Sequence, residues 1–134
     1  MSAIFTPDLD TAIVRYQVEN LDRSIAFYTE HLGFALRHRA GPVATVARGA
    51  LHVLLSAPTA SGGRPMPDGS RQAPGGWNRM VLYVDDLDGA VARLQQARAH
   101  FRNSVESGPG GKQILLDDPD GNPIELHEAP KPSA

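Results

Sequence analysis

An internal repeat constrains the fold of this chain more than any other feature. Residues 18–26 match residues 84–92 at a constant offset of 66, with identical residues at four positions and Ile25 facing Val91 at a fifth. A fixed offset of this kind indicates that one supersecondary unit occurs twice. The chain is therefore expected to contain two structurally similar halves.

Each half is predicted to form a strand, a helix and three further strands. The helices begin near Asp22 and Asp88, whose carboxylates suit N-cap or first-turn positions beside free backbone N–H groups. Apolar residues at three- and four-residue spacing extend the first helix to Gly33 and the second to a point near Arg98. Four strands and one helix cannot bury a core alone, so the halves must share one. The predicted strands are 12–18, 35–39, 43–47, 51–55, 79–84, 101–105, 113–116 and 124–127.

A stretch rich in glycine and proline separates the two copies. Nine of the twenty-one residues from 57 to 77 are Gly or Pro, and neither a helix nor a central strand runs through such a segment. Met66 and Trp77 within it favour a partial lid over a cavity. We predict a single domain over 1–134, with module one at about 11–56, the connector at 57–77, module two at about 78–128 and a frayed tail at 129–134.

Composition and charge exclude several classes of protein. Thirteen Lys and Arg face fifteen Asp and Glu, a formal charge of -2, whereas a nucleic-acid groove or a polybasic membrane surface needs a basic excess. No apolar run approaches the ~20 residues of a membrane helix, and the N-terminus lacks the features of a signal peptide. The chain has no cysteine, so it forms no disulfide and has no thiolate nucleophile. We expect a cytoplasmic protein with no nucleic-acid or membrane partner.

Two motifs resemble those of a known family. They are Val18-x-x-Leu21-x-x-Ser24-Ile25-x-Phe27-Tyr28-x-x-x-Leu32-Gly33-Phe34 and Asp118-Pro119-Asp120-Gly121-Asn122-Pro123-Ile124-Glu125-Leu126. With the internal repeat, they resemble the vicinal oxygen chelate superfamily, which includes glyoxalase I, bleomycin-resistance proteins and extradiol dioxygenases. The resemblance covers about residues 11–128 and implies an α+β fold, in which two βαβββ modules form curled mixed sheets around a cavity.

The resemblance also implies four metal-ligand positions, and this chain keeps one of them. In the family's metal enzymes, a divalent ion held by His and carboxylate ligands chelates two neighbouring substrate oxygens. The two His positions correspond here to Ile13 and Arg79, and the late strand of module one offers Val53 or Leu54, with the register between them open. Arg79 is a permanent cation that opposes a metal ion. Only Glu125 matches a ligand, so we expect no cofactor.

An improvised metal site is the alternative that the sequence leaves open. If Leu54 faces the cavity, His52 faces it too, and His127 shares a strand face with Glu125, because strand side chains alternate. His52, Glu125 and His127 would then hold a divalent metal such as Fe, Mn, Ni or Zn.

The strand phase selects the candidate ligand-binding residues. The more apolar phase of each module's first strand should pack under the helix, which turns Arg15, Gln17, Arg79 and Tyr83 toward the cavity. Lys112 follows a glycine-rich turn and is expected near the cavity mouth. The predicted ligand-binding residues are Arg15, Gln17, His52, Trp77, Arg79, Tyr83, Lys112 and Glu125.

Two of these side chains have competing interpretations. Arg79 either pairs with Glu125 across the module interface, binds an anionic ligand through its planar guanidinium, or points to solvent. Trp77, the single tryptophan, either stacks on a flat ligand or seals the edge of the core. An aromatic or anionic small molecule is therefore the expected ligand.

Because three of the four ligand positions are lost, we expect a metal-independent protein that binds or sequesters a small molecule. The resemblance to bleomycin-resistance proteins, which act in antibiotic resistance, implies that the fold can sequester a drug without turning it over, and family analogy implies a homodimer. One alternative is a metal-dependent, glyoxalase- or dioxygenase-like lyase or oxygenase with a displaced ligand set. Another is an interaction module without a ligand. Fold analogy does not choose between them, so whether the chain is an enzyme stays open.

Overall fold

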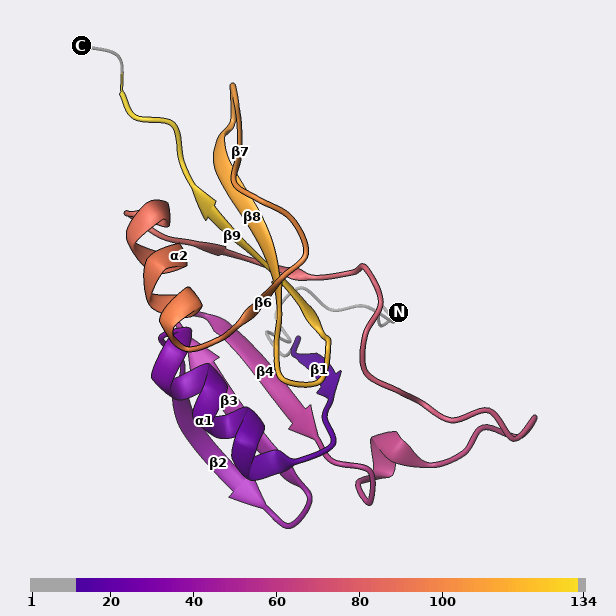
Figure 1. The fold of residues 1–134 in the computed structure, drawn as a ribbon. Helices are drawn as coiled ribbons and strands as arrows, with labels where there is room; N and C mark the ends of the chain where they lie inside the picture. The colour runs from indigo at the N-terminus through magenta and orange to yellow at the C-terminus, as the bar shows by residue number, and fades with distance from the viewer. Residues whose placement is uncertain (1–11, 133–134) are drawn as a thin grey trace, which may run out of the picture.

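The computed structural model describes residues 12–132, which form two sheets, each with one helix packed against it (Figure 1). The first sheet contains β1 (Val14–Gln17), β2 (Ala35–Ala40), β3 (Val43–Arg48) and β4 (Leu51–Ser56), and α1 (Leu21–His31) joins β1 to β2. The second sheet contains β5 (Met80–Tyr83), β6 (His100–Phe101), β7 (Glu106–Gly108), β8 (Gly111–Asp117) and β9 (Pro123–Glu128), and α2 (Leu87–Gln96) joins β5 to β6.

Both sheets have the same strand order. The first runs β1-β4-β3-β2 and the second runs β5-β9-β8-β6, with β7 also paired to β8. In each sheet the strand before the helix lies parallel to the last strand of the module, and the remaining neighbours are antiparallel. The predicted α+β fold, built from two βαβββ modules with mixed sheets, is confirmed.

Polar caps start both helices two residues before the acids selected from the sequence. The Asn20 side chain accepts a hydrogen bond from the Arg23 N–H at 2.9 Å, and Asp86 accepts one from the Gly89 N–H at 3.0 Å. Asp22 and Asp88 therefore occupy the first turns, where a negative charge faces the positive end of the helix dipole.

The two halves share one apolar core between the helices and the helix-facing sides of both sheets. A single cluster of buried side chains includes Tyr28 and Val53 from the first half and Leu82 and Leu126 from the second. In β5 the alternate residues Val81 and Tyr83 are exposed. The predicted phase of this strand is therefore confirmed, and the exposed set defines a second, open face of the sheet.

Two buried tyrosines fasten the halves together. The Tyr16 hydroxyl donates to the Pro123 carbonyl at 3.0 Å and accepts from the Met80 N–H at 3.3 Å. The Tyr28 hydroxyl donates to Asp118 Oδ2 at 2.9 Å. Burial raises the pKa of Asp118, whereas the hydrogen bonds that its carboxylate accepts from Asn122, Asp120 and Tyr28 lower this pKa by a smaller amount.

The predicted strand 101–105 is wrong in its extent. Strand β6 ends at Phe101, because the Asn103 side chain accepts the Leu115 N–H at 2.8 Å, the donor that a continuing strand would use. The chain then forms the additional strand β7, which pairs with β8 across the predicted glycine-rich turn at 108–111. A side chain thus ends the first pairing with β8, and the backbone forms a second one.

The connector packs against the first module through a short 3-10 helix, η1 (Ser61–Gly63). The Gln17 side-chain amide donates to the Gly62 carbonyl at 3.0 Å, and Gly62 packs against the guanidinium of Arg15.

Residues 1–11 and 133–134 lie outside the described residues. Three predictions fall there: the module start at 11, the N-terminal segment without signal-peptide features, and the end of the tail. No helix of residues 12–132 has the length and apolar character needed to span a membrane.

Candidate functional site

The open face of the second sheet brings together most of the ligand-binding residues that the sequence predicted in the second module. Val81 pairs in register with Glu125, and Tyr83 pairs with His127. Paired residues point to the same side of a sheet, so the four side chains form one surface opposite α2. Arg79 precedes β5 and extends this surface at its end.

Arg79 and Glu125 form an ion pair on this face. Two nitrogens of the Arg79 guanidinium, Nε and Nη2, lie 3.2 Å and 3.0 Å from Glu125 Oε1. The Glu125 side chain is only 9% exposed and that of Arg79 is 29% exposed. Of the three interpretations of Arg79, the ion pair with Glu125 is present, but it was expected across the module interface, and both residues belong to the second module.

His127 continues the network on the other side of Glu125. Its Nδ1 lies 3.3 Å from Glu125 Oε2, and its Nε2 lies 2.8 Å from the Gly110 carbonyl oxygen. A carbonyl accepts hydrogen bonds only, so the Nε2 position carries a proton. The Tyr83 ring tilts against the imidazole with 5.2 Å between ring centres, which fixes both rings beside the charged pair.

The open face of the first sheet contains the other group of predicted residues. Arg15 pairs in register with Leu54, and Val53 is buried on the helix side. Leu54, rather than Val53, is therefore the late-strand residue that faces outward, and His52 shares its face by the alternation of strand side chains. The connector covers Arg15 and Gln17 at one end of this face.

Two of the predicted residues lie apart from these groups. Lys112 faces the helix side of the second sheet, where its ammonium lies 3.3 Å from Asp88 and 3.7 Å from Glu128. Trp77 is 69% exposed and stacks against the Arg102 guanidinium at 4.6 Å, so it does not seal the core.

The alternative metal ligands are consequently not gathered within one chain. His52 belongs to β4, whereas Glu125 and His127 belong to β9 in the other sheet. Within residues 12–132, no three His, Asp or Glu side chains are arranged to hold a metal ion.

Two further residues belong to the open face and were not selected from the sequence. Gln113 pairs in register with His127 and Leu115 with Glu125, so β8 contributes both to this surface. The alternation of strand side chains could have found them. Ile114 and Leu116 are buried on one face of β8, so Gln113 and Leu115 lie on the other.

Comparison with known proteins identifies the family. The sequence profile of the Glyoxalase/Bleomycin resistance protein/Dioxygenase superfamily matches residues 5–126, whereas no curated protein matches the chain. Similar solved structures include TnmS3, an antibiotic-binding protein from Streptomyces sp. CB03234, with 25% identity, a TM-score of 0.64, and coverage of 90% of this chain and 97% of that one.

Two further structures show the same fold. A member of the superfamily from Sphaerobacter thermophilus DSM 20745 is 26% identical, with a TM-score of 0.67 over 88% of this chain and 97% of that one. The fosfomycin resistance protein FosX from Listeria monocytogenes is 12% identical, with a TM-score of 0.70 over 90% and 93%. The chain belongs to the Glyoxalase/Bleomycin resistance protein/Dioxygenase superfamily, as its two motifs predicted.

Proposed function

We propose that this protein binds a small organic molecule on the open faces of its sheets without a resident metal ion. The observation that carries the proposal is the Arg79–Glu125 ion pair. It occupies two of the four positions at which the sequence resemblance implies metal ligands. A guanidinium at one of these positions neutralises the carboxylate at another, and this leaves a polar surface without a free anionic ligand.

The residues present do not fit a divalent cation. Glu125 Oε1 accepts both N–H groups of Arg79, and the guanidinium has no lone pair to offer a metal. Ile13 and Leu54 stand at the remaining two positions and have apolar side chains. One nitrogen of His127 could still bind a metal, because the other contacts the Gly110 carbonyl, but one imidazole beside a carboxylate paired with Arg79 is too small a ligand set for these ions.

The character of the second sheet's open face supports an aromatic or anionic ligand. Tyr83 is 62% exposed and Val81 is 45% exposed, so a flat ring can lie against apolar surface. Arg79 presents a planar donor next to them, which suits a carboxylate or another anion. The similarity to TnmS3, described as an antibiotic-binding protein, supports ligand binding on this fold.

The proposal includes a cytoplasmic homodimer. Exposed apolar side chains occur on or beside the open faces of both sheets, with Ile13 54% exposed in addition to Val81 and Tyr83. A second copy of the chain would remove from water the part of this apolar surface that a bound ligand leaves uncovered. Light scattering after size exclusion should give twice the chain mass, and Val81→Glu should give the monomer; a wild-type monomer at all concentrations would refute the dimer.

Metal content tests the proposed independence from metal. The protein is incubated with Ni²⁺, Zn²⁺, Mn²⁺ or Fe²⁺, desalted, and analysed for bound metal. We expect far less than one ion per chain. One ion per chain in the wild type, lost in His52→Ala or in Glu125→Gln, would instead establish the displaced metal site of a lyase or oxygenase.

Ligand binding is tested with aromatic antibiotics and metabolites, using the fluorescence of the single tryptophan, Trp77, and calorimetry. Tyr83→Ala and Arg79→Met should weaken binding. Lys112→Met is the matched control, because Lys112 lies on the opposite face of the same sheet. If no compound binds, or if all three variants lose affinity equally, the open face is not the binding surface.

A further inference from the structure

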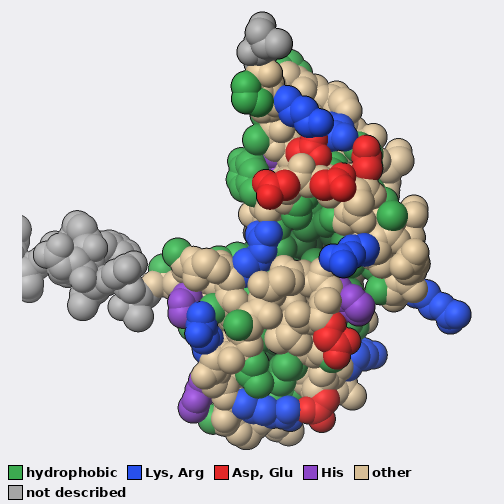
Figure 2. Space-filling model, turned by 90° about the vertical axis from the view of Figure 1, so that its left-hand side faces the viewer, with side chains coloured by type: hydrophobic (Ala, Val, Ile, Leu, Met, Phe, Trp, Pro, Cys, Tyr) green, Lys and Arg blue, Asp and Glu red, His purple; other side chains and the backbone are tan. Residues whose placement is uncertain are grey.

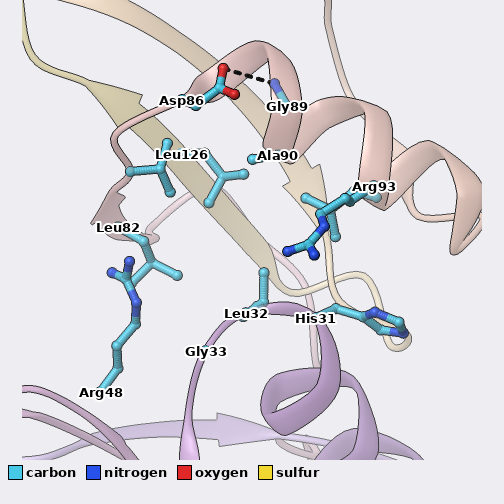
Figure 3. A pocket seen from close by; sticks show the side chains of 12 residues that line it. His31, Leu32, Gly33, Arg48, Leu82, Asp86, Gly89, Ala90, Arg93 and Leu126 are labelled. Atoms are coloured by element: carbon cyan, nitrogen blue, oxygen red, sulfur yellow. Dashed lines mark hydrogen bonds between the residues drawn. The ribbon is translucent and has the colours of Figure 1, made fainter.

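A second hollow lies on the helix-bearing side of the molecule, away from the open faces. It has a volume of about 460 Å³ and lies between the end of α1 and the first turns of α2 (Figure 3). Leu32, Leu82 and Leu126 provide apolar walls. Leu82 and Leu126 alternate with Val81 and Glu125 along their strands, so the hollow and the proposed ligand face lie on opposite sides of the second sheet.

The internal repeat explains why this hollow exists. In the first half, three residues of α1 bind the turn between β8 and β9 of the second half. Arg23 donates to Asp120 at 2.6 Å, Ser24 donates to the same carboxylate at 3.2 Å, and Tyr28 donates to Asp118 at 2.9 Å. These side chains fill the contact between α1 and the opposite module.

The equivalent positions of α2 contain small or apolar residues. At the offset of 66, Arg23, Ser24 and Tyr28 correspond to Gly89, Ala90 and Leu94, and all three line the hollow. The corresponding turn of the first half joins β3 to β4 and has no aspartate, and the residue before it, Arg48 at the end of β3, lines the hollow. The second contact between the modules therefore has neither the tyrosine ring nor the carboxylates of the first.

Basic groups flank the hollow from both modules. Figure 2 shows an apolar recess between the two halves with basic side chains on either side and acidic ones above it. Arg48 and Arg93 line the recess from opposite sides, and His31 lies on the side of Arg93. Within residues 12–132 neither arginine forms an ion pair, although Arg48 donates to the Tyr83 carbonyl at 2.7 Å. Asp86 is the one acid in the lining, and it caps α2 through Gly89.

We propose that this hollow is a second binding site, which accepts a small organic carboxylate with an apolar body. The apolar body would occupy the space that Tyr28 fills in the first half. The carboxylate would lie between Arg48 and Arg93, whose planar guanidinium groups suit its two oxygens. The site is separate from the open face of the sheet, so occupancy of one does not require the other.

Three matched probes test the site in the full-length protein: 3-phenylpropionate, 3-phenylpropan-1-ol and 3-phenylpropylamine. Binding is followed by the amide signals of the ¹⁵N-labelled protein. We expect the acid to shift the signals of Gly33, Gly89 and Ala90, and to bind about a hundredfold more tightly than the alcohol, as two charge-assisted hydrogen bonds worth about tenfold each imply. The amine should bind most weakly.

Variants connect the binding to named groups. Arg48→Met and Arg93→Met should each weaken the acid about tenfold and leave the alcohol unchanged, and Ala90→Leu should block both compounds by filling the space. Arg71→Met, in the exposed connector, should have no effect. Three results would overturn the proposal. The acid and the alcohol could bind with equal affinity, the shifted signals could centre on Val81 and His127, or millimolar acid could give no saturable shift.

Discussion

The Arg79–Glu125 pair makes the sharpest prediction, because its energy can be worked out from burial and geometry. Replacing Arg79 by Met leaves a carboxylate that is 9% exposed with His127 as its remaining ionisable contact. Breaking a buried pair from one side costs roughly 3–5 kcal/mol. Since the Arg79 side chain is 29% exposed, solvent screens part of the interaction, and we expect a loss of about 2 kcal/mol.

The opposite replacement should cost less. In Glu125→Gln, the more exposed guanidinium keeps its contact with water and with the Trp77 carbonyl at 3.3 Å, so we expect a loss of about 1 kcal/mol. The double variant buries no uncompensated charge and should also lose about 1 kcal/mol. Subtracting the two single losses from the double loss gives a coupling energy of about 2 kcal/mol in favour of the pair.

Urea unfolding at constant pH and ionic strength measures the four free energies of unfolding. Arg39 and Asp22 form an exposed pair, with side chains 44% and 79% exposed, and the cycle of Arg39→Met and Asp22→Asn is the matched control. This control should give a coupling energy below about 1 kcal/mol. If the Arg79 cycle is additive to within about 0.5 kcal/mol, the pair does not hold Glu125, and the argument against a metal ion at this carboxylate fails.

Three other perturbations follow from the structure. Burial raises the pKa of Asp118 above its ordinary value of 3.8. The stability that this carboxyl contributes is therefore complete below pH 3.8 and is lost as the pH rises through the raised pKa. Tyr28→Phe removes a donor that lowers this pKa, so urea titrations of the variant should show the loss extending to higher pH. Arg98 has a φ of 61° at the end of α2, so Arg98→Gly should stabilise the protein by about 0.5–1 kcal/mol in thermal unfolding, and destabilisation would refute strain there. A Cβ at Gly63 would meet the Pro58 backbone carbonyl, whereas a Cβ at Gly62 would meet the flexible end of the Arg15 side chain. Gly63→Ala should therefore lower the free energy of unfolding by about 1–3 kcal/mol, measured in urea, and Gly62→Ala should lower it less.

The sequence predicted the fold well because the decisive signals are local and repeated. The two blocks at the offset of 66 each place a strand before a helix, and the alternation in 79–84 assigns Val81 and Tyr83 to the open face. The same alternation was sufficient to place Glu125 and His127 side by side. These inferences depend on period and spacing, which tertiary contacts leave intact.

The errors concern contacts between residues distant in sequence. The end of β6 depends on Asn103 reaching the Leu115 N–H, and no periodicity marks such a side-chain bond. Lys112 was assigned to the cavity mouth from its turn, but its strand phase turns it toward Asp88 and Glu128 on the helix side. The placement of Arg79 beside Glu125 within one module, rather than across the modules, follows from the parallel pairing of β5 with β9.

The two contacts between the modules show how duplication can produce a cavity without any loss of fold. Substituting Leu94 by Tyr would restore the ring present at Tyr28, but it would add a hydroxyl to a hollow lined by Arg48 and Arg93, which accept no hydrogen bond. The first contact is closed because its donors face Asp118 and Asp120. The second contact has arginine donors instead, and within residues 12–132 neither Arg48 nor Arg93 forms an ion pair. An anionic molecule with an apolar body meets both requirements at once, since it replaces the ring and supplies the negative charge that the β3–β4 turn lacks.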